Sequence, residues 1–138
     1  MKMRIMLDAG AYAPERAHKT DAGLDIKSPK DTVVPAHGSR LIGTGVHIEL
    51  PENTVGMLKS KSGLNVKHGI VSEGVIDEGY NGEIITKLYN HSEVDYKINA
   101  GDKITQLVVI PCLYVEPEIV ESIASGERGS AGFGSTGR

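Results

Sequence analysis

The chain has 138 residues, which is the length of one domain of ordinary size. Its formal net charge of −3 offers no basic surface to nucleic acid, and no apolar run approaches the roughly 20 residues of a membrane-spanning helix. The single cysteine, Cys112, cannot form an internal disulfide and suits a reducing compartment, so we expect a cytoplasmic protein.

Short segments in which apolar and polar residues alternate predict half-buried β-strands at 3–7, 46–50 and 84–88. In the last of them, Ile84 would face the core and Ile85 would face away. Turn-forming clusters separate the strands, and 62–68 is the best place for a helix. The chain therefore predicts an all-β fold, a distorted jelly roll or β-sandwich with at most one short helix.

We expect the β domain to cover residues 1–124 and a flexible, glycine-rich arm to cover 125–138. The arm holds the only phenylalanine of the chain, Phe133. Terminal glycine-rich segments are usually disordered. However, Arg128, Ser135 and Thr136 add a charge and two hydroxyls beside glycines, which let backbone amides approach a ligand. Composition alone leaves both interpretations open.

Common metal and dinucleotide patterns are missing from the sequence. The chain has no CxxC or HExxH, and its five histidines have no metal-ligand spacing, so no dedicated zinc site is expected. A GxGxxG match at 132–137 lies next to the C-terminus with no helix to follow it, which excludes a Rossmann-type site.

Five polar, glycine-bearing segments at strand edges could carry chemistry: 20–28, 58–69, 73–84, 100–111 and 126–138. In the first, Asp25 alone fits a turn or capping residue. In the second, Lys59 and Lys61 stand among serines at a predicted helix start, which suits either phosphate binding or a solvated basic loop.

The third segment predicts a hairpin in which a turn around Gly79 brings Tyr80 back beside Asp77. Such a hairpin could hold a flat ligand against the main chain, or it could be an ordinary surface hairpin. In the fourth segment, Gln106 lies among aliphatic residues. Its amide needs a partner there, either a neighbouring main chain or a ligand oxygen.

Together and in this order, the five segments resemble the motifs of the trimeric deoxyuridine triphosphate nucleotidohydrolases, the dUTPases. The motifs are DAGLDI, KSGL, GVIDEGYNGE, GDKITQL and RGSAGFGSTG, and the resemblance covers residues 21–138. It implies a jelly-roll-like protomer, a homotrimer whose three active sites are each shared between the chains, and an arm that closes over a neighbour's site.

The resemblance also implies hydrolysis of dUTP to dUMP and pyrophosphate, by water attacking the α-phosphorus with Mg²⁺ on the triphosphate. Asp77 would be the base that activates the water. Tyr80 would pack under the deoxyribose, and main-chain groups of Gly74 and Val75 would read the uracil.

In the same family pattern, Asp25 would act on the metal indirectly, through water. Phosphate contacts would come from the second and fourth motifs, at Lys61, Ser62, Gly63 and Gln106. The fifth motif would clamp the nucleotide, with Phe133 stacking on uracil and with Arg128, Gly134, Ser135 and Thr136 around the phosphates.

The sequence departs from the family pattern at Lys61 and Lys103, in the short stretch 71–74 and at Ala131, which replaces a frequent glycine. Lys61 and Lys103 stand where the family more often has arginine, so a point charge replaces a two-pronged donor. Two further functions remain open: a deoxycytidine triphosphate deaminase, which shares the fold and releases ammonia, and a binding or regulatory protein that uses a nucleotide only as a signal.

Overall fold

The structure is a computed structural model that describes residues 2–124, 126 and 129–130. These residues form nine strands and one helix: β1 (Arg4–Leu7), β2 (Gly23–Lys27), β3 (Thr32–Val34), β4 (Ser39–Glu49), β5 (Thr54–Lys59), α1 (Ser62–His68), β6 (Ile70–Ile76), β7 (Glu83–Asn90), β8 (Tyr96–Ile98) and β9 (Lys103–Pro111). The predicted helix at 62–68 is confirmed.

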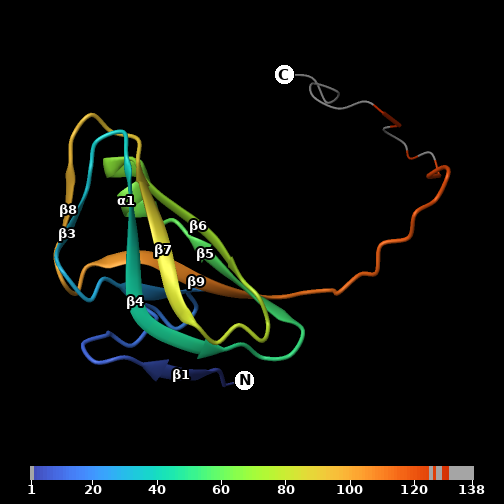
Figure 1. The fold of residues 1–138 in the computed structure, drawn as a ribbon, viewed down its shortest axis with the longest axis horizontal. Coiled ribbons are helices and arrows are strands. Elements are labelled where there is room, and N and C mark those ends of the chain that lie inside the picture. Colours follow the sequence, from blue (N-terminus) through green and yellow to red (C-terminus); the bar gives the residue numbers. More distant parts are fainter. Residues whose placement is uncertain (1, 125, 127–128, 131–138) are drawn as a thin grey trace.

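Seven strands form one antiparallel sheet in the order β1-β4-β7-β6-β5-β9-β2, and β3 pairs with β8 in a small second sheet. The large sheet is strongly curled (Figure 1). Ile26 of the edge strand β2 therefore shares one buried cluster with Ile48 of β4, although four strands separate them in the sheet. The all-β, jelly-roll-like fold predicted from the sequence is confirmed.

A second buried cluster fills the space between the small sheet and the large one. Val34 of β3 and Ile98 of β8 pack there with Leu88 of β7 and Ile104 of β9. β7 alternates as predicted, because Ile84 is buried whereas Ile85 is exposed. The inward-facing apolar residues of β7 are buried because other strands cover that face.

The expectation for the first strand was wrong. β1 forms, but Ile5 is 40% and Leu7 is 41% exposed, so neither face of the strand is buried. β1 is an edge strand that pairs only with β4, and no second layer from the described part of this chain lies over it. An alternating pattern of apolar and polar residues predicts a strand, but one face of that strand is buried only where another layer of the protein covers it.

After β9 ends at Pro111, residues 112–124 run away from the sheet (Figure 1). This segment exposes large apolar side chains, among them Leu113 at 88% and Ile123 at 89%. Within the described residues, no helix is long and apolar enough to cross a membrane.

Candidate active site

A row of polar residues crosses the sheet where β2, β9, β5 and β6 lie side by side. Asp25 is opposite Gln106, Gln106 is opposite Lys59, and Lys59 is opposite Glu73. Residues from four of the five segments, 20–28, 58–69, 73–84 and 100–111, thus meet on one sheet. The row lies at the end of the β5–β6 pair from which the chain enters α1.

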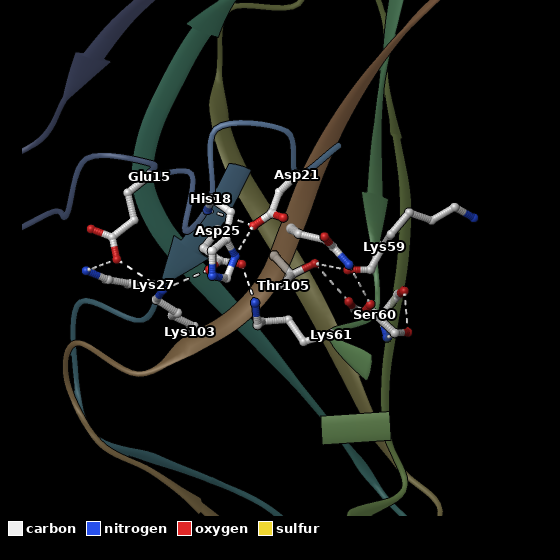
Figure 2. A network of polar contacts seen from close by, with 12 residues as sticks. Glu15, His18, Asp21, Asp25, Lys27, Lys59, Ser60, Lys61, Lys103 and Thr105 are labelled. Atoms are coloured by element: carbon white, nitrogen blue, oxygen red, sulfur yellow. Dashed lines mark hydrogen bonds and ion pairs between the residues drawn. The ribbon is translucent and has the colours of Figure 1, made fainter. Parts of the chain in front are cut away.

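Asp25 is a strand residue rather than the turn or cap that it could have been. Only 6% of Asp25 is exposed, and its carboxylate contacts the ammonium groups of Lys61 and Lys103, the latter at 2.9 Å (Figure 2). Lys103 also lies 3.2 Å from Glu15, whose carboxylate is 2.9 Å from Lys27. Positive and negative charges therefore alternate along the network.

The network keeps its members charged. Burial raises the pKa of Asp25, but hydrogen bonds from Lys61 and Lys103 outweigh it and hold that pKa below the ordinary value. Hydrogen bonds from Lys27 and Lys103 lower the pKa of Glu15. Hydrogen bonds to Asp25 and Glu15 raise the pKa of Lys103. A buried carboxylate and a fixed ammonium thus persist at neutral pH.

Hydroxyl groups hold the loop that carries Lys61. The hydroxyl of Ser60 donates to the Ser72 carbonyl at 3.0 Å, and the Ser72 hydroxyl lies 2.9 Å from that of Thr105. The Gln106 amide donates to the Ser60 carbonyl at 3.0 Å, so the main chain is its partner. A Cβ at Gly23 would lie 2.2 Å from the Gln106 side-chain oxygen, which explains the glycine there.

The start of α1 presents small polar residues to solvent. Lys61 is the N-cap and makes no side-chain capping bond, while Ser62 and Gly63 are exposed in the first turn. Lys59 is directed elsewhere, because its ammonium binds both carboxylate oxygens of Glu73 at 3.0 and 2.9 Å. Of the two lysines in this motif, only Lys61 approaches Asp25.

The third motif forms a tight hairpin between β6 and β7. The Tyr80 amide donates to the Asp77 carbonyl at 3.1 Å, and Gly79 takes a positive φ of 87° in that turn. The Tyr80 hydroxyl donates to the Glu83 carbonyl at 2.9 Å. A Cβ at Gly82 would lie 2.5 Å from that hydroxyl, so only glycine leaves room for the ring.

A cavity of about 200 Å³ adjoins this hairpin, and its lining includes Gly74, Val75, Asp77 and Tyr80. One oxygen of the neighbouring Glu78 carboxylate, Oε2, accepts from the Asn53 amide at 2.8 Å and from the Tyr114 hydroxyl. Its hydrogen bond raises the pKa of Tyr114 to about 12. Asp77, by contrast, is exposed to solvent.

The two groups of motif residues do not meet within one chain. Lys59 is paired with Glu73, whereas Asp77 follows Ile76, which is paired with Gly56. The hairpin is therefore about 10 Å further along β6 than the row that contains Asp25, and at the other end of β5. The predicted arm residues Arg128, Phe133, Gly134, Ser135 and Thr136 lie outside the described residues.

Glu15 was missed by the sequence reasoning. It lies outside all five motifs, and it reaches the network because its backbone pairs with that of Asp25 through two hydrogen bonds of 3.1 and 2.7 Å. An isolated bridge from an irregular loop has no periodic signal in the sequence. Among the described residues, no group of three histidine, cysteine or carboxylate side chains could hold a metal ion.

The fold and the placement of these motifs define a class: an all-β protein with polar clusters at both ends of one strand pair. A family model described as dUTPase matches residues 10–137. The chain belongs to the dUTPase family.

Its relatives include the deoxyuridine 5'-triphosphate nucleotidohydrolase of Clostridium acetobutylicum, which is 46% identical over 134 residues and covers 95% of this chain and 92% of the relative. The protein of the same name from Gloeothece citriformis is 42% identical over 141 residues, covering 99% and 97%. Among solved structures, the Staphylococcus bacteriophage 80alpha dUTPase with dUPNHPP has a TM-score of 0.92 at 32% identity and covers 99% of both chains.

Proposed function

We propose that the protein hydrolyses dUTP to dUMP and pyrophosphate, which keeps uracil out of DNA and supplies dUMP for thymidylate synthesis. Relatives that carry the name deoxyuridine 5'-triphosphate nucleotidohydrolase, at 46% and 42% identity, support this activity. The observation that carries the proposal is the β6–β7 hairpin, where an exposed carboxylate, a fixed aromatic ring and a small cavity adjoin one another.

The hairpin supports the base-reading and catalytic roles. Gly74 and Val75 line the cavity, and their main-chain groups would contact the edge of uracil. The ring of Tyr80 would pack under the deoxyribose and leave no room for a ribose 2′-hydroxyl. Asp77 would orient and deprotonate the attacking water, a role that its exposure permits, whereas the less exposed Glu78 already accepts two hydrogen bonds at Oε2.

The network around Asp25 supports the phosphate-binding role. Lys61, Ser62 and Gly63 at the start of α1, together with Gln106, would contact the phosphate chain. One buried carboxylate between ammonium groups does not fit a direct metal cage, but it fits Mg²⁺ held through water at Asp25 and directly by the triphosphate. Bound there, the ion would neutralise phosphate charge.

We further propose that three copies share each active site. The Asp25 network and the Asp77 hairpin lie at opposite ends of the β5–β6 pair, so neighbouring copies would supply them separately to one dUTP molecule. The exposed apolar residues on β1 and on 112–124 would be covered by neighbouring copies. Residues 125–138 would form the arm, with Phe133 stacking on uracil and with Arg128, Gly134, Ser135 and Thr136 closing over the phosphates.

The test is a pyrophosphate-release assay with dUTP, dTTP, UTP and dCTP, with and without EDTA. We expect rapid release from dUTP only, and loss of it in EDTA. Ammonia released from dCTP would instead identify a deaminase, and tight dUTP binding without turnover would identify a binding protein. The lone cysteine also suits the cytoplasm, which cell fractionation would check.

A further inference from the structure

Beside the β6–β7 hairpin, β4 makes an excursion from its regular pairing with β7. Gly43 is opposite Ile85 and His47 is opposite Glu83, so β4 uses two residues more than β7 over this stretch. Gly45 has a positive φ of 67°, and its amide donates to the Glu83 carboxylate at 2.8 Å. The excursion turns the His47 side chain toward the return half of the hairpin.

Both ring nitrogens of His47 face oxygen atoms that can only accept hydrogen bonds. Nδ1 lies 3.0 Å from the Asn81 carbonyl oxygen, and Nε2 lies 3.2 Å from a carboxylate oxygen of Asp8. The side chain is only 18% exposed, so water has limited access to the ring. Because neutral imidazole has one N–H, only the imidazolium form satisfies both contacts.

We propose that His47 is a positioning residue, whose imidazolium clamps the hairpin that carries Asp77 and Tyr80 to the N-terminal segment through Asn81 and Asp8. This proposal rests on the proposed function in one respect: the hairpin that His47 holds is the one that would carry out the chemistry. When the imidazolium loses a proton, the remaining N–H stays with the charged acceptor, Asp8, because such bonds are stronger. The contact with the hairpin is then lost.

The charged groups around the ring favour the clamped state. Asp8 faces it from the segment after β1, and Glu83 faces it from β7. Arg4 of β1 lines a cavity of about 500 Å³ together with His47, but Arg4 is paired with Glu49 of β4. The hydrogen bonds to Asn81 and Asp8 raise the pKa of His47 above the ordinary value of 6.5, against a smaller opposite effect of burial.

The sign of the pH effect follows from that raised pKa. The clamp is complete at pH values below 6.5, and it is lost as the pH rises through the higher pKa of the folded protein. We therefore expect the hairpin to be held most firmly on the acidic side of neutrality and to loosen on the alkaline side.

An NMR titration of the ¹⁵N-labelled protein without nucleotide tests the clamp directly. The His47 ring signals are those absent from the His47→Gln variant. We expect them to titrate above the ordinary range, and the amide signals of Asn81 and Gly82 to shift with the same midpoint. Asp8→Asn should lower the midpoint, whereas Glu93→Gln, which breaks the His37 pair of 2.9 Å, should leave it unchanged.

A kinetic test uses the same variants. In Asp8→Asn, neutral His47 can donate to Asn81 and accept from the new amide, so this contact should no longer depend on pH. Relative to this variant, wild-type kcat/KM should fall about three- to tenfold as the pH rises through the His47 midpoint, which is the effect of losing one hydrogen bond. The Glu93→Gln variant should follow wild type.

The outcomes separate the two proposals. An ordinary or lowered His47 midpoint, or hairpin amides that do not follow it, would overturn the clamp whatever the enzyme does. If the NMR midpoints behave as expected but no variant and no wild-type protein hydrolyses dUTP, then the clamp stands and the proposed activity fails. Identical pH profiles of kcat/KM for wild type and Asp8→Asn would show that the clamp has no effect on catalysis, which would overturn the positioning role of His47.

Discussion

Asp25 and Asp77 are the two carboxylates that the motifs single out, and the fold gives them opposite surroundings. Asp25 is buried between two ammonium groups, which makes it a fixed charge. Asp77 follows the end of β6 and is exposed, so it can contact water and substrate. The sequence motifs point to both residues, but only the fold shows that one is buried between ammonium groups and that the other is exposed.

Replacing Asp77 by Asn should reduce turnover of dUTP by at least about a hundredfold, the lower range for removal of a general base. Because Asp77 is exposed, the change should leave the free energy of unfolding within about 0.5 kcal/mol of wild type. Pyrophosphate release, together with calorimetric binding of a non-hydrolysable dUTP analogue, checks both effects. A Glu78→Gln variant is the matched control, and it should retain the base; an Asp77→Asn enzyme as fast as wild type would contradict the mechanism.

Asp25 should make folding stability depend on acid pH. Its pKa is lowered in the folded protein, so its stabilising contribution is full above the unfolded value of 3.8 and is lost as the pH falls through the lower folded value. At pH 7, Asp25→Asn should lower the free energy of unfolding by about 2 kcal/mol, since two ammonium groups lose their partner.

Urea unfolding in EDTA, measured from pH 7 down to pH 3, checks this contribution. The difference between wild type and Asp25→Asn should shrink toward the acid end. Glu49→Gln serves as the control, because its ion pair with Arg4 is exposed and should contribute less than about 1 kcal/mol. A constant difference across the range would show that packing, and not charge, makes Asp25 important.

At the scale of elements, local patterns predicted what local forces determine. The alternation in 84–88 predicted β7, and the one short helix expected at 62–68 is α1. The exposure of β1 could not be predicted, because it depends on which layer covers that strand. The different partners of Lys59 and Lys61 could not be predicted either, because only the β5–β6 register places Glu73 opposite Lys59.

Gly69 determines how α1 ends and where β6 begins. It is the C-cap of the helix with a φ of 65°, and its amide bonds to the carbonyls of Leu64 and Asn65. Gly69→Ala should destabilise the protein by about 1 kcal/mol, because an L-residue with Cβ is strained in this conformation. Gly69→Asn should cost less, since asparagine tolerates the left-handed region. If urea unfolding shows equal losses of stability for the two variants, then limited space, and not the positive φ, is the reason for the glycine.

At the scale of the whole molecule, two features of the single chain favour the proposed trimer. Its phosphate-binding candidates and its hairpin lie at opposite ends of the β5–β6 pair, and its segment 112–124 carries apolar side chains that no described residue covers. The sequence motifs predict the parts of a site, but they carry no information on which copy would supply each part. A shared trimeric site accounts for both features at once.

Complementation between two inactive chains tests this arrangement. One chain ends at residue 124 and lacks the arm, and the other carries Asp77→Asn. Each should form inactive homotrimers. Co-expressed with different tags and purified as mixed trimers, they should regain about one working site in three, because each mixed trimer combines one intact Asp77 with an arm from another copy in one of its three symmetric sites.

The result depends on geometry that a self-contained site lacks. If Asp77, the Asp25 network and the arm all served their own chain, then no mixture would regain activity, because each chain carries one defect. Light scattering should report trimers for all three preparations, which excludes failed assembly as a cause of inactivity. Full wild-type activity in a monomeric preparation would refute the shared site, because one chain would then supply every group that the reaction needs.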